Sequence, residues 1–157
     1  MSKPGELTGI AVRSKSRAPM QECLVAEASI DNGVAGDFRG TGKRPVTLMS
    51  EELWAEVEAE LGMPLQWTLR RINLLIRGLD FSALHDCTLE IGSAQLIVRG
   101  TTPPCGRMDE QVPGLTKALD SDDRGGLWAT VTRPSTIQIG DRVEIIDAVP
   151  APTSFET

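Results

Sequence analysis

Turn-forming residues recur along the whole chain and limit the length of every secondary-structure element. The 157 residues include 15 glycines and 10 prolines, which are spread through the sequence rather than gathered in one linker. The apolar segments between them have the usual length of β-strands, about five or six residues. Short strands separated by frequent turns are typical of a mainly β fold. Because closing a sheet removes its exposed edges, we predict a closed or partly closed β-barrel with a few peripheral helices.

Local patterns place the predicted elements along the chain. The predicted strands cover residues 6–13, 20–30, 45–49, 69–76, 87–91, 94–98, 127–133 and 142–146. The Gly92-Ser93 dipeptide between two of them is typical of a tight β-hairpin turn. Ser50 is a favoured helix N-cap, and apolar residues at helical spacing follow it as far as Gly62, which favours a helix end. The pattern predicts a helix over 51–61, and we expect a shorter one over 115–120.

The composition excludes several classes of function. The net charge of −6 argues against sequence-independent nucleic-acid binding, which depends on cations that neutralise phosphates. One histidine is too few for a His-rich zinc site, and three cysteines without a Cys-x-x-Cys pair do not form a disulfide framework. No apolar run approaches the length of a membrane span, about 18 residues, and the N-terminus lacks a signal-peptide core. We expect one cytoplasmic domain over 1–147 and a flexible tail over 148–157, with no membrane or nucleic-acid partner.

Cys105 is the residue that most suggests chemistry. It follows Pro103-Pro104 and precedes Gly106-Arg107, so we expect it in a stiff loop with little bulk beside it. A guanidinium group at Arg107 would favour the thiolate form, which attacks sulfur or binds a soft metal. The alternative is a cysteine in a turn without any function.

Basic residues form a second candidate feature. The glycine-rich segment 31–44 carries Arg39, Lys43 and Arg44, and we expect it to be a long loop. Guanidinium groups and exposed N–H groups of such a loop are suited to a phosphate monoester. Strand alternation predicts that Arg71 shares a largely apolar face with Leu75, where a charge needs a partner or an anionic ligand. For the basic residues of the loop, the alternative is an ordinary solvated surface charge.

Two polar residues complete the candidate set, each with a structural alternative. Asn73 would orient a ligand through its amide, or would satisfy backbone groups of a loop. Asp37 would accept a hydrogen bond from a ligand amine, although Gly-Asp is mainly a turn dipeptide.

Taken in order, several segments resemble those of the MOSC domain family, which is named after the C-terminal domain of molybdenum-cofactor sulfurase. These segments are GDF (36–38), KRPVTLMSEELW (43–54), LRRIN (69–73), GLD (78–80), EIGSAQLIV (90–98), PPC (103–105), RGGLWATV (124–131) and IQIGDRVEI (137–145). The likeness covers residues 33–146 with order and spacing kept. It implies a β-rich barrel that binds molybdenum through a pterin, the molybdopterin cofactor.

The resemblance also implies roles for individual residues. Cys105 matches the family cysteine, which either ligates molybdenum or carries a persulfide. Arg71 and Asn73 match the Arg and Asn of the family's R-x-N segment, which lies against the cofactor. The basic residues of the loop match less closely, because this chain reads RGTGKRP where some members have a His-Gly-Gly-Pro-Asp run.

Two functions follow from the resemblance and stay open at this point. The first is a small molybdenum-dependent oxidoreductase that reduces N-hydroxylated compounds. Its electrons would come from a separate reductase, because the chain has no flavin or iron–sulfur signature. The second is a non-catalytic sulfur carrier or cofactor-binding module that receives a persulfide on Cys105 from a pyridoxal-phosphate-dependent cysteine desulfurase. In either case we expect no bound cofactor after expression without cofactor supply.

Overall fold

A computed structural model describes residues 4–15, 18–38, 40–102, 112–120 and 124–148. The strands are β1 (Gly5–Val12), β2 (Gln21–Glu22), β3 (Val25–Ser29), β4 (Gly33–Val34), β5 (Val46–Ser50), β6 (Leu74–Arg77), β7 (Cys87–Ile91), β8 (Ala94–Thr101), β9 (Leu127–Arg133), β10 (Ser135–Gln138) and β11 (Arg142–Ala148). The helices are α1 (Glu51–Leu61) and α3 (Leu115–Leu119), with 3₁₀ turns η1 (Trp67–Arg70) and η2 (Phe81–Ala83).

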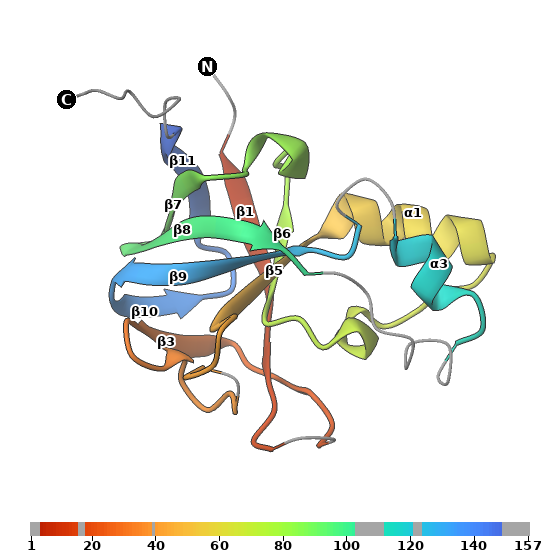
Figure 1. Cartoon of the computed structure of the whole chain (residues 1–157), viewed down its shortest axis with the longest axis horizontal. Helices are drawn as coiled ribbons and strands as arrows, with labels where there is room; N and C mark the ends of the chain where they lie inside the picture. Colours follow the sequence, from red (N-terminus) through yellow and green to blue (C-terminus); the bar gives the residue numbers. More distant parts are fainter. Residues whose placement is uncertain (1–3, 16–17, 39, 103–111, 121–123, 149–157) are drawn as a thin grey trace.

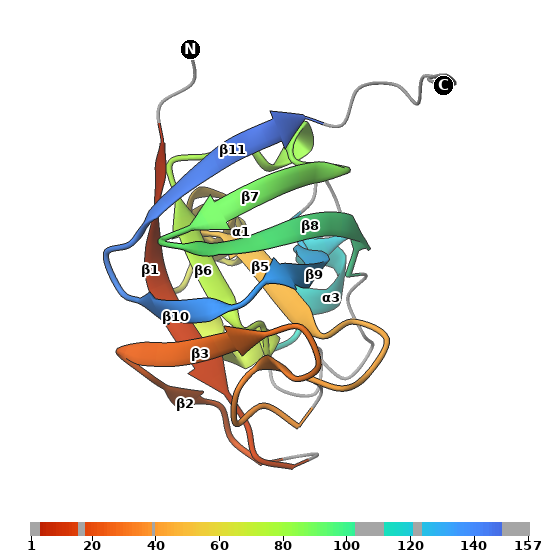
Figure 2. The ribbon, with the colours of Figure 1, turned by 90° about the vertical axis from the view of Figure 1, so that its left-hand side faces the viewer.

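Seven strands close into a barrel, as the frequent turns predicted. Their order is β11-β7-β8-β9-β5-β6-β1, and β1 pairs back with β11. The β5–β6 pair is parallel, and the other pairs of the barrel are antiparallel. A separate three-stranded sheet of β10, β3 and β4 lies next to β8 and β9 (Figure 2). The chain therefore has a mainly β fold with a closed barrel.

Alternating burial along the strands fills the barrel interior. In β7, for example, Cys87, Leu89 and Ile91 are buried while the residues between them are only partly buried, the period of two expected of a strand with one face on a core. A second apolar cluster lies outside the barrel under the helices, where Trp54 and Val57 of α1 pack with Leu115 of α3. Figure 1 shows α1 and α3 side by side on one side of the barrel. None of the helices in the described residues is long and apolar enough to cross a membrane.

Helix α1 begins and ends where its capping residues predicted. The Ser50 hydroxyl accepts a hydrogen bond from the backbone N–H of Leu53 at 3.1 Å. At the other end Gly62 takes the left-handed conformation at φ 71°, and its N–H donates to the carbonyl of Glu58. Both caps satisfy backbone groups that the helix leaves without partners. The predicted helix 51–61 is confirmed.

The predicted strand 69–76 is wrong in its first half. Residues 67–70 form η1, Arg71 is left-handed at φ 65°, and β6 begins only at Leu74. Strand alternation therefore does not act on Arg71, and the shared face predicted with Leu75 does not follow. The left-handed residue turns the chain, so an extended ladder cannot start before it.

Further sequence expectations differ in smaller ways. The predicted strand 20–30 is split into β2 and β3 at Cys23 and Leu24, and the short strands β4 and β10 were not predicted. The predicted hairpin is confirmed, with Gly92 at φ 57° as a tight turn of that type needs. The tail from residue 149 lies outside the described residues.

Candidate functional site

The ends of three neighbouring strands are tied together by Asn73. Its Oδ1 accepts hydrogen bonds from the backbone N–H and the hydroxyl of Thr47, each at 3.1 Å, and its Nδ2 donates to the Ala11 carbonyl at 3.1 Å. The backbone adds two bonds, from Asn73 N to Thr47 Oγ1 and from Ala11 N to the Asn73 carbonyl. Ala11 belongs to β1 and Thr47 to β5, and Asn73 immediately precedes β6. We call this set of contacts the Asn73 junction.

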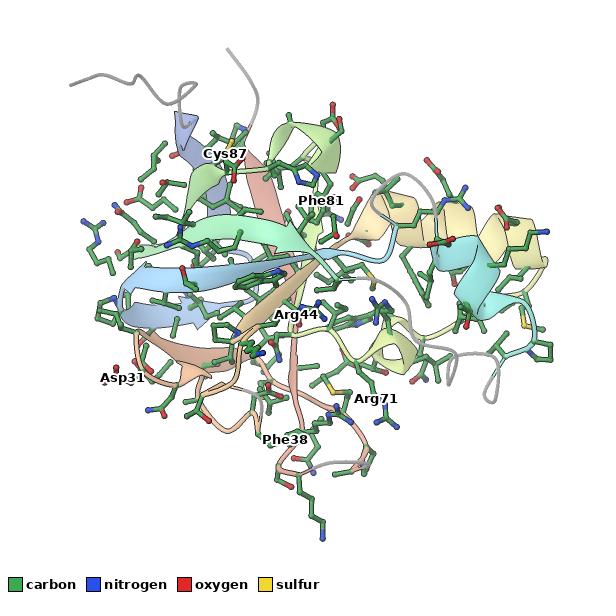
Figure 3. The ribbon with its side chains drawn as sticks, in the orientation of Figure 1. Asp31, Phe38, Arg44, Arg71, Phe81 and Cys87 are labelled. Atoms are coloured by element: carbon green, nitrogen blue, oxygen red, sulfur yellow. The ribbon has the colours of Figure 1, made fainter. Side chains whose placement is uncertain are left out.

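Basic residues lie in the chain segments next to the Asn73 junction. Arg13 lies two residues after Ala11, Arg44 three residues before Thr47, and Arg71 two residues before Asn73. Since β5, β6 and β1 are adjacent in the barrel, the chain segments that carry these residues enter or leave the barrel at the same end. Figure 3 shows Arg71 and Phe38 in the lower part of the view and Arg44 near its middle, while Cys87 and Phe81 lie in the upper part.

The basic residues of this end differ in exposure. Lys43 and Arg44 are exposed, and Arg71 is partly buried. Arg71 also holds a left-handed backbone conformation, at φ 65°, which costs a non-glycine residue about 1 kcal/mol. A strained residue of this kind marks a candidate for function, because other residues must hold it there.

Arg13 is a residue that the sequence analysis missed. Only 5% of it is exposed, and its guanidinium carbon lies 5.0 Å from the centre of the Phe38 ring. The backbone on both sides is fixed as well, since Phe38 N donates to the Arg13 carbonyl at 2.8 Å. A charged residue at the end of an apolar strand pattern, as in residues 9–13 (GIAVR), is the sequence signal that indicates Arg13.

Asp37 and Asn73 serve the backbone in the described contacts. The Asp37 carboxylate accepts a hydrogen bond from the backbone N–H of Arg13 at 3.1 Å and so fixes the segment before β5 against the end of β1. Asn73 is 3% exposed and holds the junction together. The Asp37 carboxylate joins two segments 24 positions apart, and the Asn73 amide bonds to residues of β5 and β1. A contact of either side chain with a ligand stays a prediction.

A second cluster lies where the chain leaves β8 and enters β9. Arg70 is 7% exposed, and its Nη2 donates to the Thr102 carbonyl at 2.8 Å and to the Gly125 carbonyl at 2.7 Å. The Thr102 hydroxyl donates to the same Gly125 carbonyl at 2.7 Å. We call this set the Arg70 clamp. The two consecutive arginines thus differ in exposure: Arg70 is buried in the clamp, and Arg71 is partly exposed to solvent.

Three predicted site residues lie outside the described residues: Arg39, Cys105 and Arg107. Thr102 is the last described residue before Cys105. Among the residues that the structure describes, no three His, Cys, Asp or Glu side chains gather in a way that would hold a metal ion. The described part of the candidate site is therefore a basic barrel end rather than a set of metal ligands.

A surface hollow at the other end of the barrel is less suited to a ligand. It is lined by Gly5, Glu6, Arg77, Gly78 and Arg142, among others. The Arg77 guanidinium already donates to Glu6 at 2.6 Å, and this hydrogen bond, together with the charges of Glu6 and two further glutamates, raises the pKa of Arg77 above its usual value. An anionic ligand would meet several carboxylates here.

The comparisons with known proteins identify the fold and the family. The chain is similar to the YuaD protein from Bacillus subtilis, with a TM-score of 0.76 and 17% identity over 90% of this chain and 94% of that chain. It is also similar to YiiM from Geobacillus stearothermophilus, with a TM-score of 0.75 and 16% identity over 92% and 76%. For YiiM from Escherichia coli the values are 0.70 and 14%, over 92% and 71%.

At these identities the three structures establish the fold alone. A search among curated protein sequences gave no significant match. The family model described as MOSC domain matches residues 35–144, which include the segment before β5, the Asn73 junction except Ala11, and the Arg70 clamp. This chain belongs to the MOSC domain family.

Proposed function

We propose that this protein binds the molybdenum cofactor at the barrel end of the Asn73 junction and reduces N-hydroxylated compounds with electrons from a separate reductase. The observation that carries the proposal is that Arg13, Arg44 and Arg71 each lie two or three residues from a position joined in the Asn73 junction. The chain has a net charge of −6, so a basic end of this kind is not a consequence of its overall composition.

The residues at this end suit a cofactor that carries a phosphate. Guanidinium groups bind phosphate oxygens with two parallel hydrogen bonds, and Arg71 and Arg44 both reach solvent at this end. Lys43 adds a further exposed cation beside Arg44. Asp37 and Asn73 would hold the segments that carry these cations, through the hydrogen bonds to Arg13 and Thr47. We assign Arg39 and Arg107 to the same set on their place in the sequence.

Cys105 is the proposed molybdenum ligand. A thiolate is the type of ligand that such a metal accepts, and Arg107 two residues later would favour the thiolate form. Bound molybdenum would supply the acceptor for the substrate oxygen. The reduction itself converts an N–OH group into N–H and water, and it consumes two electrons and two protons. We propose a separate reductase as their source.

The test uses protein expressed in a host that makes the molybdenum cofactor. We expect close to one molybdenum per chain by elemental analysis, and reduction of an aromatic amidoxime by the loaded protein with reduced methyl viologen as donor. Cys105→Ser should lose the reduction, and Arg71→Ala should lower the molybdenum content by about ten-fold, the effect of losing roughly 1.4 kcal/mol of phosphate binding. Arg99→Ala is the matched control, because Arg99 is exposed on β8 and contacts only Thr130 in the described residues.

The same preparation separates the enzyme from a sulfur carrier. A carrier would contain no molybdenum after such expression. Incubation with a cysteine desulfurase and cysteine would instead add about 32 Da to Cys105, the mass of one sulfur atom in a persulfide. This result, with no reduction of the amidoxime, would overturn the proposed oxidoreductase.

A further inference from the structure

The Arg70 clamp buries a charged group directly before the partly exposed Arg71. Arg70 is the last residue of η1 and is 7% exposed, and its Nη2 donates to the carbonyls of Thr102 and Gly125. Removing a guanidinium group from water is costly unless strong hydrogen bonds compensate for it. A buried arginine in this place therefore has to be explained by what it holds.

Ile72, on the other side of Arg71, lies against the glycine that follows the clamp. It is 1% exposed, and a Cβ atom at Gly126 would lie 3.3 Å from the Ile72 Cδ1 atom. The packing at the clamp is also close, since a Cβ atom at Gly125 would lie 2.7 Å from the Thr102 carbonyl oxygen. Thr102 N donates to the Gly126 carbonyl at 2.9 Å, so this surface is bonded across two segments. The residues before and after Arg71 are therefore held by one closely packed surface.

Between these two anchors Arg71 takes a conformation that a side chain disfavours. Its backbone is left-handed, at φ 65° and ψ 39°, and its N–H donates to the Thr68 carbonyl at 3.2 Å. Glycine adopts this conformation without the steric cost that a Cβ atom brings. The neighbours of Arg71 therefore have to impose the turn that separates its exposed side chain from the buried one of Arg70.

We infer that Arg70 is a positioning residue for Arg71, because its hydrogen bonds to Thr102 and Gly125 hold the left-handed turn that carries the Arg71 guanidinium. The inference rests on the proposed function in one respect, namely that Arg71 binds the phosphate of the cofactor. A guanidinium on a backbone that is fixed in advance loses less conformational freedom on binding an anion than one on a mobile segment, so it binds more tightly.

Two substitutions weaken the clamp without removing Arg71. Arg70→Lys keeps the positive charge, but an ammonium on a flexible stem does not reproduce the fixed donor directions of a planar guanidinium. Thr102→Val removes only the hydroxyl that donates to the Gly125 carbonyl at 2.7 Å. It should fold even if Arg70→Lys does not, with a smaller change in the same direction.

The first test needs no ligand and compares glycine with alanine at position 71. Both substitutions remove the guanidinium, so the difference between their melting temperatures reports on the backbone. We expect Arg71→Gly to melt about 2–4 °C above Arg71→Ala, because alanine keeps the Cβ atom in the left-handed conformation. With Arg70→Lys added to both, the difference should fall by more than half, since the effect of glycine on the unfolded chain cancels. A difference that stays the same in folded Arg70→Lys and Thr102→Val proteins would overturn the inference.

The second test measures anion binding by protein without cofactor. Inorganic pyrophosphate is titrated by calorimetry, and Arg70→Lys should raise its dissociation constant by at least about three-fold, the result of losing a preorganised cation. Arg99→Lys is the matched control, and Ile91→Val lowers stability in the barrel core on β7. Both should leave the constant within about 1.5-fold, since distant independent sites do not couple.

The two tests separate the inference from the proposed function. A folded Arg70→Lys protein that binds pyrophosphate as the wild type does would contradict a positioning role for Arg70. A wild-type protein that binds no pyrophosphate contradicts the proposed phosphate site, and the comparison of melting temperatures still decides whether Arg70 holds the turn at Arg71.

Discussion

At the scale of single residues, Asn73 shows why an amide is needed at the junction of β1, β5 and β6. The carboxamide accepts through Oδ1, from Thr47, and donates through Nδ2, to Ala11. A carboxylate has no donor at neutral pH, so an aspartate would place a negative oxygen against the Ala11 carbonyl. The junction therefore needs a side chain that both donates and accepts hydrogen bonds, which an aspartate of the same size and shape does not do.

Asn73→Asp would remove the side-chain donor to the Ala11 carbonyl. The substitution should lower the free energy of unfolding by about 2–3 kcal/mol, because it leaves a buried carbonyl without a donor and introduces a buried charge. Urea denaturation followed by tryptophan fluorescence measures the change. Asn32→Asp is the control, since Asn32 is exposed. In the described residues its backbone N–H donates to the Ser29 hydroxyl, and its side-chain amide makes no hydrogen bond. Equal stability of the two variants would contradict the role assigned to Asn73.

At the scale of elements, local sequence signals predicted what local chemistry controls. Ser50 and Gly62 fix the bounds of α1 through their own hydrogen bonds and conformation, so a reader of the sequence can place that helix. The segment before β6 is different. Its apolar letters suggest a strand, but the Asn73 side chain bonds to the Thr47 N–H before the ladder with β5 begins. Only the fold brings Thr47 to Asn73, 26 positions later, so the sequence pattern could not show it.

In the candidate site, too, the sequence indicates some residues, whereas others are recognised only from the packed structure. The family that the resemblance predicted is confirmed, whereas the cofactor contacts that it implies for Arg71 and Asn73 stay predictions. The resemblance did not single out Arg13 or Arg70, because their importance comes from burial and from partners on distant segments. A single sequence records residue types and spacing, whereas burial of a charge is a property of the packed chain.

Arg124 gives a prediction at the scale of elements. Arg124 directly precedes Gly125 of the Arg70 clamp. Its guanidinium bonds to Glu60 at 2.7 Å and to Glu56 at 3.3 Å, and these two glutamates are one helical turn apart on α1. The hydrogen bond to Glu60 is the main cause that raises the pKa of Arg124, against the opposing effect of burial. The arginine side chain is 14% exposed, so α1 is attached to the segment before β9 by a largely buried group.

Arg124→Met should therefore lower the free energy of unfolding by about 2 kcal/mol, less than for a fully buried pair because both glutamates are half exposed. Arg133→Met is the matched control. Arg133 pairs with Glu90 at 2.9 Å but is 54% exposed, and exposed pairs contribute about 0–1 kcal/mol. Urea denaturation of both variants makes the comparison. If the two losses were equal, Arg124 would be only another surface charge.

At the scale of the whole molecule, closing the barrel separates rigid strands from the segments that connect them. The seam between β1 and β11 joins the two ends of the described chain, so the strands hold one another in a ring. Segments that leave this ring can vary, while their starting points stay fixed. The closed sheet was predictable from the turns, but the separate sheet of β10, β3 and β4 was not.

The distribution of charge in the whole molecule gives the last prediction. Five of the 22 acidic residues lie on α1, whereas the basic residues Arg13, Lys43, Arg44 and Arg71 lie in the segments next to the Asn73 junction. Charge is therefore distributed unevenly in a molecule whose net charge is −6. Inorganic pyrophosphate, used as a probe, should bind at the basic end and raise the melting temperature. At ten times its dissociation constant the gain is about 1.4 kcal/mol, and screening should remove most of it in about 0.5 M NaCl. Arg71→Ala should abolish the shift at low salt and Arg99→Ala should keep it; a shift that survives in Arg71→Ala would place the anion elsewhere.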